Sequence, residues 1–406
     1  MSTCRSCGSS QLSVFLSLGD LPLADGLLKP EDLGGSEPQY PLDVALCESC
    51  ALVQILHTVP PEELFCRDYP YFSSYSDTLL AHSRANVERL IVSRELGPQS
   101  LVVELASNDG YLLQYFVAAG IPVLGIDPAE GPARVAVERG IPTLCTFFTH
   151  DLACRLRGEG RRADVIIANN VLAHVPDLNG FVSGIATLLA DDGVVVIEAP
   201  YVRDLIDHNE FDTIYHEHLC YWSVTAADAL FRRHGLTLTD VERLSIHGGS
   251  LRLYGEPGVR EQSTTVRDML AAERACGMTT MEYYRGFAGR VANVKRQLGD
   301  LTRSLREQGK RIAGYGAAAK GTILLNYVGM GAEVLDFVVD RNVHKQGRYV
   351  PGVRLPIRSP DALLAEMPDY VLILPWNFRD EILAQQSTYR ERGGRFIVPI
   401  PEPVVV

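Results

Sequence analysis

Two Cys-x-x-Cys pairs near the start of the chain, Cys4/Cys7 and Cys47/Cys50, constrain its fold more than any other feature. Each pair places two thiolates on one tight turn, and two such turns supply the four ligands of a tetrahedral zinc site. A catalytic zinc ion needs an open position and usually has histidine or carboxylate ligands, so a structural Zn²⁺ is favoured. A redox function is disfavoured, because neither pair begins a helix in a βαβ pattern. We therefore predict a small module that folds around zinc.

Composition limits the classes of function for the whole chain. With 406 residues, 46% of them hydrophobic, the chain has room for about two or three domains. Its formal net charge of -12 disfavours binding to nucleic acid, which needs a basic face. The first residues lack the apolar segment of a secretory leader, and no run of about 18 apolar residues occurs, so we expect a cytoplasmic protein without membrane contact. The cysteines outside the two pairs are scattered, as is typical of reduced thiols.

The middle of the chain has the alternating pattern of a Rossmann-like sheet. Residues 101–105 form an apolar run that ends at a turn of small and polar residues, and residues 111–119 have a helical pattern. Further apolar strands are predicted at 121–127, 164–170 and 193–198. Strands that are apolar throughout are typical of a parallel sheet covered on both faces. In such sheets, ligands bind at the carboxyl ends of the strands.

Polar residues stand at those strand ends and are candidates for a cofactor site. A carboxylate at the end of the second strand can accept hydrogen bonds from both hydroxyls of a ribose, so Asp127 is the predicted ribose ligand. The other candidates at or near strand ends are Glu104, Ser107, Asn108, Gly110, Asn169 and Asn170. The alternative is that these are solvated turn residues.

The last part of the chain repeats the strand–turn–helix pattern at residues 310–321. A Gly-rich turn there fits G-x-G-x-x-A, and Asp340 ends the next strand. This predicts a second Rossmann-like domain and leaves an NAD(P)-dependent oxidoreductase as an alternative. Lys320 and the basic stretch 340–348 instead favour a nucleoside diphosphate such as TDP, because lysine and arginine make charge-assisted hydrogen bonds to phosphate.

Several motifs together resemble those of a known enzyme family. Residues 104–110, 127–128 and 169–174 are similar to motifs of S-adenosylmethionine (SAM) methyltransferases, although the turn departs from the usual G-x-G-x-G. The whole chain resembles the zinc-containing TDP-deoxysugar C-methyltransferases of antibiotic pathways. The other motifs that carry this resemblance are 68–76, 211–218, 247–252 and 314–321. Their order and spacing supply the specificity that the turn alone lacks.

The resemblance implies a monomeric, SAM-dependent enzyme that methylates a TDP-linked 4-keto-deoxysugar, with C3 as the favoured position and C5 as the alternative. It adds Ala106, Pro128 and Tyr75 to the cofactor residues. For the substrate it implies contacts from Ser250, Arg252, Gly314, Tyr315, Gly316, Lys320, Asn342 and Asn377. The remaining alternative is a non-catalytic scaffold that binds zinc and a nucleotide.

Residues 215–218, Tyr-His-Glu-His, are the densest ionisable cluster in the chain. Their spacing differs from the H-E-x-x-H of zinc proteases. A sugar carbon becomes nucleophilic when a base removes its proton next to a ketone, and histidine has the pKa for that step, so His218 is the candidate base. Donors to the enolate oxygen would come from Tyr215, His174 or Tyr69, and Glu217 would orient a histidine or hold a sugar hydroxyl. The resemblance implies the same five catalytic residues.

The expected architecture is α/β and has three parts. A zinc-binding module covers residues 1–75, and a central Rossmann-like SAM methyltransferase domain covers 76–264. A helical connection and a second Rossmann-like domain occupy 265–406. Within the connection, residues 281–305 have a helical pattern.

Overall fold

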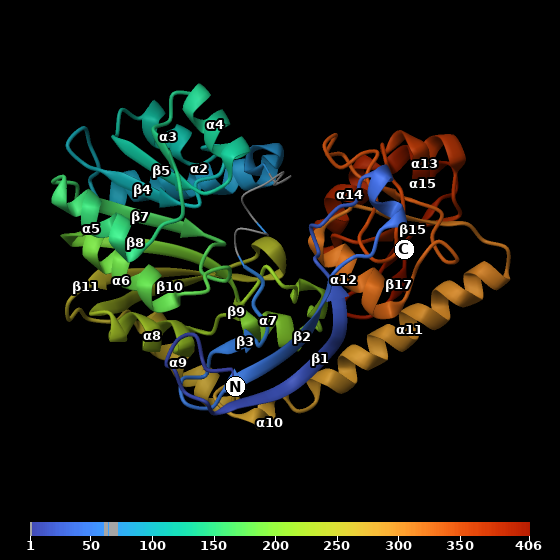
Figure 1. The fold of residues 1–406 in the computed structure, drawn as a ribbon, viewed down its shortest axis with the longest axis horizontal. Coiled ribbons are helices and arrows are strands. Elements are labelled where there is room, and N and C mark those ends of the chain that lie inside the picture. The colour runs from blue at the N-terminus through green and yellow to red at the C-terminus, as the bar shows by residue number, and fades with distance from the viewer. Residues whose placement is uncertain (1, 61–63, 65–71) are drawn as a thin grey trace.

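The computed structural model describes residues 2–60, 64 and 72–406; the predicted catalytic Tyr69 lies outside these residues. The described chain is an α/β protein with three sheets. In Figure 1 the seven-stranded sheet occupies the left half and the six-stranded sheet the right half. Strand β1 (Leu12–Pro22) of the smallest sheet runs between them and contacts α12 (Ala319–Val328) of the right half. The predicted fold class is confirmed.

The N-terminal sheet is antiparallel and takes one strand from the middle of the chain. Its order is β1–β2–β3–β9, and its last strand is formed because Val53 pairs with Tyr221. One Cys-x-x-Cys turn precedes β1, and the other begins at the last residue of β2. The helical turn η1 lies in the connection between these two strands. The bounds are β2 Gln39–Cys47, β3 Val53–Ile55, β9 Cys220–Tyr221 and η1 Pro30–Gly34.

The central sheet has the order β10–β11–β8–β7–β4–β5–β6. The five strands from β8 to β6 are parallel, and β11 is antiparallel to both of its neighbours. The chain starts at β4, in the interior, adds β5 and β6 on one side and then β7 and β8 on the other, so the order reverses between β4 and β7. The bounds are β4 Val102–Leu105, β5 Val123–Asp127, β6 Thr143–Cys145, β7 Ala163–Asn169, β8 Leu189–Pro200, β10 Leu236–Leu244 and β11 Ser250–Pro257.

Helices connect these strands, as the alternating sequence pattern predicts. The strands β4, β5 and β8 are buried nearly throughout, because helices cover the sheet on both faces. Ser, Thr or Asp side chains cap several of the helices, and Ser76 accepts a hydrogen bond from Leu79 at the start of α2. The bounds are α2 Asp77–Ser93, α3 Leu113–Ala118, α4 Glu130–Glu138, α5 His150–Gly158, α6 Leu178–Leu188, α7 Val202–Asp207, α8 Val224–Arg233, η2 Ser73–Tyr75, η3 Phe211–Thr213 and η4 Ile246–Gly248.

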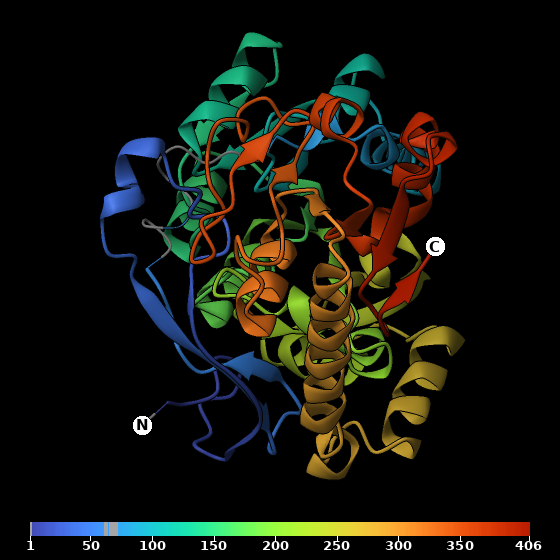
Figure 2. The ribbon, with the colours of Figure 1, turned by 90° about the vertical axis from the view of Figure 1, so that its right-hand side faces the viewer.

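Three helices connect the two larger sheets: α9 (Thr264–Ala275), α10 (Met281–Tyr284) and α11 (Phe287–Glu307). The prediction of one helix over 281–305 is wrong at 285–286, where Gly286, a poor helix former, separates α10 from α11. Helix α11 lies along the lower right of Figure 1 and in front in Figure 2. No helix in the described part of the chain is long and apolar enough to span a membrane.

The C-terminal sheet has the order β14–β13–β12–β15–β16–β17, and all of its strands except β17 are parallel. Its order reverses between β12 and β15, so this is a second Rossmann-like unit. The bounds are β12 Ile312–Tyr315, β13 Val338–Val339, β14 Ile357–Arg358, β15 Tyr370–Ile373, β16 Arg395–Val398, β17 Val404–Val405, α13 Asp361–Glu366, η5 Trp376–Phe378, α14 Arg379–Gln385 and α15 Ser387–Glu391.

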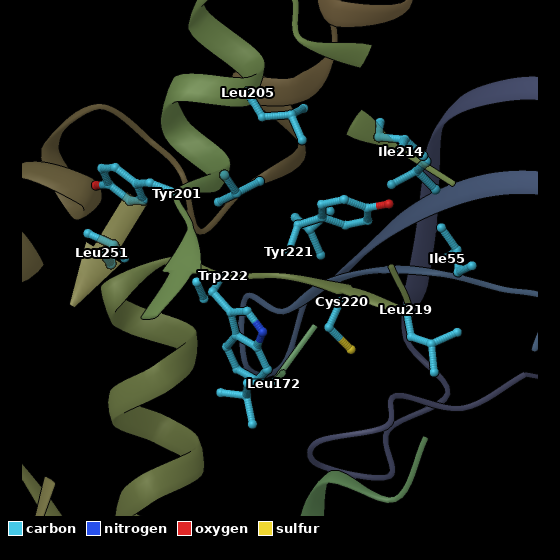
Figure 3. Packing of buried hydrophobic residues seen from close by; sticks show 14 of the residues in the cluster. Ile55, Leu172, Tyr201, Leu205, Ile214, Leu219, Cys220, Tyr221, Trp222 and Leu251 are labelled. Atoms are coloured by element: carbon cyan, nitrogen blue, oxygen red, sulfur yellow. The ribbon is translucent and has the colours of Figure 1, made fainter. Parts of the chain in front are cut away.

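One buried apolar cluster extends through all three sheets and the connecting helices. Phe15 of β1 packs against Tyr284 and Phe287, with ring centroids 4.7 and 6.3 Å apart. Figure 3 shows the part around β9, where Tyr221 and Trp222 lie among buried side chains of other elements. Because apolar burial is the main force in folding, this shared core holds the three sheets in the arrangement that forms the site.

Candidate active site

A cavity of about 920 Å³ lies between the carboxyl ends of strands from the two larger sheets. The turns after β4, β5 and β7 line one side, and the turns after β12, β13 and β15 line the other. The strand order reverses between β4 and β7 and between β12 and β15, and open α/β sheets bind ligands at such points. The predicted residues that line it are Tyr75, Ala106, Asn108, Asp127, Pro128, Asn169, Asn170, His174, Tyr215, Glu217, His218, Tyr315, Gly316, Lys320 and Asn377.

The turn after β4 has the backbone of a glycine motif, although two of its positions carry side chains. Ala106, Asn108 and Gly110 all have positive φ, at 54°, 49° and 77°. Glycine adopts this left-handed region freely and asparagine tolerates it, whereas alanine is strained there by about 1–2 kcal/mol. At Gly110 a Cβ atom would lie 2.3 Å from Cδ1 of Ile141. The departure from G-x-G-x-G therefore changes the residues while the left-handed positions remain.

Asp127, at the end of β5, holds this turn in place. Its Oδ2 accepts the N–H of Asn108 and its Oδ1 that of Ala129, both at 2.8 Å. Burial raises the pKa of Asp127, and the two amides act against that rise. Each carboxylate oxygen can accept a further hydrogen bond, and the residue lines the cavity. The carboxylate therefore fits a ribose diol.

Asp340, directly after β13, repeats the arrangement in the C-terminal sheet. Its Oδ2 accepts the N–H of Ala317 and its Oδ1 that of Asn342, both at 2.8 Å. Gly316 in this turn has a φ of 88°, and a Cβ atom there would lie 2.5 Å from Cδ of Pro375. The turn is thus restricted to glycine at this position, as the sequence motif indicates.

Unpaired buried polar atoms surround the first turn. Both carboxylate oxygens of Glu104 and the Oδ1 of Asn169 are buried without hydrogen-bond partners among the described residues. Burial, with the charges of Asp127 and Asp109, raises the pKa of Glu104 well above its usual range. Asn169 lines the cavity. The Oδ1 of Asn169 can therefore accept a hydrogen bond from a ligand with N–H or O–H donors, such as the ammonium and ribose groups of SAM.

The segment before α2 covers the same turn. The N–H of Ser73 donates to Oδ1 of Asn108 at 2.8 Å, and Ser74 donates to the carboxylate of Asp109. Ser73 and Tyr75 both line the cavity, although the Tyr75 side chain is largely exposed. This placement brings part of the 68–76 motif to the cofactor side of the cavity.

The geometry of His218 fixes its neutral tautomer. Its Nδ1 lies 2.9 Å from the carbonyl oxygen of Thr213, which can only accept, so Nδ1 carries the proton. Its Nε2 lies 2.8 Å from the hydroxyl of Tyr215 and therefore accepts that O–H. The two rings stack with centroids 3.9 Å apart. His218 thus presents a basic nitrogen in the cavity, paired with a phenol.

His174 and Glu217 complete this side of the cavity as neutral groups. Burial lowers the pKa of His174 to about 4, and its Nδ1 lies 2.5 Å from the carbonyl oxygen of Glu217. Burial, followed by the charge of Asp25, raises the pKa of Glu217 to about 8. His216 is fully buried instead, with Nε2 bonded to the carbonyl oxygen of Tyr40. Of residues 215–218, Tyr215, Glu217 and His218 therefore line the cavity, and His216 packs in the protein interior.

Basic side chains define the opposite side. Lys320 donates to Oδ1 of Asn377 at 3.0 Å, and its Nζ lies 4.4 Å from the ring centroid of Trp376. Burial lowers the pKa of Lys320, and the charges of nearby carboxylates oppose that shift. Arg341 and Lys345 also line this side. Together these groups form a cationic region at the second glycine turn, where phosphate groups are favoured.

Some predicted residues lie outside the cavity lining. Arg252 is buried in ion pairs with Glu198 and Glu242, at 2.6 and 3.2 Å, and Ser250 donates to the carbonyl oxygen of Ile246. The structure does not bring these two to the site, and their substrate role stays a prediction. The others outside the lining are Glu104, Ser107, Gly110, Gly314 and Asn342, which support the two turns from within or beside them.

The cavity also contains residues that the sequence did not indicate. Asp25 arrives from the connection after β1, and Glu210 from the segment before η3. Neither lies in a strand-end motif, so only the tertiary structure reveals them. Phe147, Phe148 and His150 follow β6, and the strand-end rule that selected Asp127 would also have selected this turn.

The four N-terminal cysteines form a closed sulfur site. The Sγ atoms of Cys4 and Cys50, and those of Cys7 and Cys47, lie 3.5 Å apart, and all four lie within 4.8 Å of one another. Tetrahedral zinc with Zn–S bonds of about 2.3 Å needs sulfurs about 3.8 Å apart, so the set fits a structural ion. The four sulfurs fill its coordination, which leaves no open position for catalysis.

Comparisons with known proteins match the whole chain to enzymes of one kind. Residues 4–65 match a family described as a zinc binding domain, residues 80–241 a methyltransferase domain, and residues 245–401 a C-methyltransferase C-terminal domain. The chain is 39% identical to C-methyltransferase NovU of Streptomyces niveus, over 99% of this chain and 96% of that protein. The chain belongs to this C-methyltransferase family. It is therefore a SAM-dependent C-methyltransferase with a zinc-binding domain, and the oxidoreductase and scaffold alternatives are set aside.

Two further similarities concern shorter parts of this C-methyltransferase. A ubiquinone biosynthesis O-methyltransferase of Bartonella tribocorum is 25% identical over 30% of this chain and 52% of that protein. The SAM-bound magnesium protoporphyrin IX methyltransferase of Synechocystis PCC 6803 superposes with a TM-score of 0.35 and 17% identity, over 45% of this chain and 82% of that chain.

Proposed function

We propose that this enzyme methylates C3 of a TDP-linked 4-keto-deoxysugar, as a monomer, through a base-formed enolate. The observation that carries the proposal is that one cavity contains both the His218–Tyr215 pair and the cationic region at the second glycine turn. A substrate that contacts both the base and the cationic region must have an acidic C–H at one end and an anionic group at the other. A keto-sugar joined to a nucleoside diphosphate has this construction.

His218 would remove the proton from the sugar carbon. Its Nδ1–H is held by the Thr213 carbonyl, so the basic electron pair is on Nε2, where it accepts the O–H of Tyr215 in the absence of substrate. The C3–H bond breaks, the proton goes to Nε2, and the electron pair of that bond enters the enolate that the C4 ketone stabilises. When bound, SAM supplies the electrophilic methyl group. The imidazolium then returns its proton to solvent, which restores the resting state.

Donors near His218 would stabilise the enolate oxygen. Tyr215, released from Nε2 when substrate enters, has an O–H to donate. Glu217 is a second donor, because its raised pKa keeps it protonated at neutral pH and its Oε2 has no partner among the described residues. Donors placed before the charge develops contribute about 3–4 kcal/mol each in comparable sites. The neutral His174 would contact a sugar hydroxyl or the same oxygen.

The two glycine turns would hold the two cofactor-sized ligands. Asp127, with Asn169 and Asn170, would bind the ribose and amino-acid parts of SAM. Lys320, Arg341 and Lys345 would bind the diphosphate of the sugar nucleotide, and Asn377 would hold Lys320 in place. The remaining cofactor and substrate residues that the sequence predicts belong to the same proposal.

The first test is calorimetric titration with S-adenosylhomocysteine and with NADH, each with and without TDP. Binding of S-adenosylhomocysteine and TDP without NADH binding is the expected result. The second is incubation with a TDP-4-keto-6-deoxysugar and SAM bearing a ¹³C methyl group, followed by NMR. A new ¹³C methyl on C3 is expected, whereas a methyl on C5, or no transfer at all, would overturn the assignment.

A further inference from the structure

The short helical turn η3 (Phe211–Thr213) lies between the C-terminal domain and the proposed base. On one side the Nε1–H of Trp376 donates to Oδ2 of Asp212 at 2.8 Å. The ring of Phe211 also lies 5.3 Å from that of Tyr327 on α12. Two separate contacts from the C-terminal domain therefore hold η3.

On its other side, η3 holds His218. The carbonyl oxygen of Thr213 accepts the Nδ1–H of His218 at 2.9 Å, and the Thr213 hydroxyl donates to the carbonyl of Glu210 at 2.7 Å. The carbonyl of Thr213 thus selects the tautomer that leaves Nε2 basic. Any shift of η3 moves this carbonyl, and with it the direction of the imidazole.

Asp212 makes the contact with Trp376 important for η3. Its side chain is fully buried, and its Oδ1 has no hydrogen-bond partner among the described residues. Without the Trp376 donor, a buried carboxyl group would lose its side-chain partner, a large penalty for a buried group. Burial already raises the pKa of Asp212 to about 6. Loss of the donor would therefore drive η3 to rearrange rather than leave it in place.

Trp376 begins η5, at the carboxyl end of β15 and next to Asn377. The Nζ of Lys320 lies 4.4 Å from the centroid of its ring. One residue thus contacts a cationic group of the proposed nucleotide region through its ring, and the catalytic segment through its N–H.

We propose that Trp376 is a positioning residue for His218, acting through Asp212 and the Thr213 carbonyl. Its effect on turnover rests on the proposed function, whereas its effect on the imidazole does not. The C-terminal domain then has a second function besides binding the nucleotide, because it sets the base of the central domain. The methyl donor has no part in this contact, so its affinity should be independent of Trp376.

The test is Trp376→Phe, which keeps an aromatic ring and removes the N–H donor. Imidazole ¹⁵N shifts of His218 are recorded in the substrate-free holoenzyme, with His218→Gln used to assign them. Expected are ¹⁵N shifts that move toward the average of two tautomers, a kcat lower by about ten- to a hundredfold, and KM for both substrates within about twofold of wild type. Glu37→Gln, which weakens a different contact to the C-terminal domain at Arg354, is the matched control and should change neither readout.

Unchanged His218 shifts in Trp376→Phe would overturn the proposal, whatever happens to turnover. Altered shifts with an unchanged kcat would support the positioning of His218 by Trp376 and overturn its catalytic consequence. If the wild-type enzyme does not act on the keto-sugar, the proposed function fails, and the NMR comparison still decides whether Trp376 positions His218.

Discussion

The backbone N–H of Asp25 donates to Oε1 of Glu217 at 3.3 Å and so joins the N-terminal module to the catalytic segment. The neighbouring residue, Ala24, accepts a hydrogen bond from Thr322 of α12 at 2.9 Å. One short stretch after β1 therefore contacts both other parts of the protein beside the cavity. The Asp25 side chain lines that cavity, and its charge is one cause of the raised pKa of Glu217.

The raised pKa of Glu217 leads us to expect that activity is lost at alkaline pH. Its pKa of about 8 keeps the carboxyl group protonated below that pH, and ionisation above it removes the donor from the enolate oxygen. We expect kcat of the wild type to fall as pH rises through about 8. In Glu217→Gln the amide donates at every pH, so this limb should disappear while kcat at neutral pH falls modestly. An alkaline limb that persists in Glu217→Gln would assign it to another group.

The raised pKa of Glu217 should also make the stability of the protein depend on pH. The folded protein retains a proton on Glu217 that the unfolded chain releases above its ordinary pKa of 4.5. The unfolded state then binds fewer protons, so the free energy of unfolding decreases between about pH 4.5 and 8, by at most about 1.4 kcal/mol per pH unit. Denaturant titrations give the free energy of unfolding at each pH. Between pH 4.5 and 8 this free energy should fall more steeply in the wild type than in Glu217→Gln, and an equal pH dependence in both proteins would contradict the prediction.

Asp25→Asn should shift the alkaline limit toward lower pH. Removal of the negative charge removes one cause of the raised pKa of Glu217, while the backbone N–H that contacts Oε1 remains. The measurement is the pH profile of kcat for this variant beside that of the wild type. A limit that stays in place, or moves to higher pH, would exclude the charge of Asp25 as a cause.

Ala106→Gly should stabilise the protein without loss of cofactor binding. Ala106 has a φ of 54°, which strains alanine by about 1–2 kcal/mol, while glycine adds about 0.5–1 kcal/mol of unfolded-state entropy. The net gain is about 0.5–1 kcal/mol, to be measured by chemical denaturation. Ala168→Gly in β7, where φ is ordinary, is the control and should destabilise. Equal destabilisation by both changes would contradict the strain at Ala106.

His218→Asn should separate binding from proton abstraction. We expect S-adenosylhomocysteine to bind as in the wild type, with solvent deuterium exchange at the sugar carbon and kcat both reduced about a hundredfold or more. His234→Asn, outside the cavity lining, should leave exchange unchanged. Undiminished exchange in His218→Asn would remove it as the base.

Zinc removal should abolish activity as well as the N-terminal fold. Structural zinc sites contribute roughly 10 kcal/mol of apparent binding free energy, and this module carries Asp25 to the cavity. Cys47→Ser should therefore lower zinc content, Tm and kcat together. Cys276→Ser, at an exposed cysteine outside the site, should change none of them. A zinc-free Cys47→Ser protein with normal kcat would contradict the link between module and site.

Site residues could be predicted from the sequence where the order of strands and turns along the chain determines their position. Asp127 and Asn169 end the buried strands β5 and β7, Asn170 follows β7, and parallel strands bring their carboxyl ends to one edge. The left-handed backbone of Ala106 could not be predicted from a residue that avoids it. Arg252 was selected from a motif, yet a buried carboxylate, Glu198, pairs with it in the sheet.

Residues from distant segments were beyond such reasoning. Asp25 reaches the cavity because β1 packs against α11 and α12, and Asp25 itself lies in no strand-end motif. Trp376 and Asp212 meet only because the two Rossmann-like units are held by one core. Contacts of this kind depend on the relative placement of whole domains.

The position of β9 separates the order of synthesis from the order of folding. The N-terminal module leaves the ribosome before the two larger sheets, and its cysteine turns can close on zinc early. The edge of β3 nevertheless remains unpaired until residues 220–221 have been made, much later in translation. That final strand follows His218 almost directly in the chain. The pairing of β9 with β3, which completes the N-terminal sheet, therefore also brings the proposed base into its place in the structure.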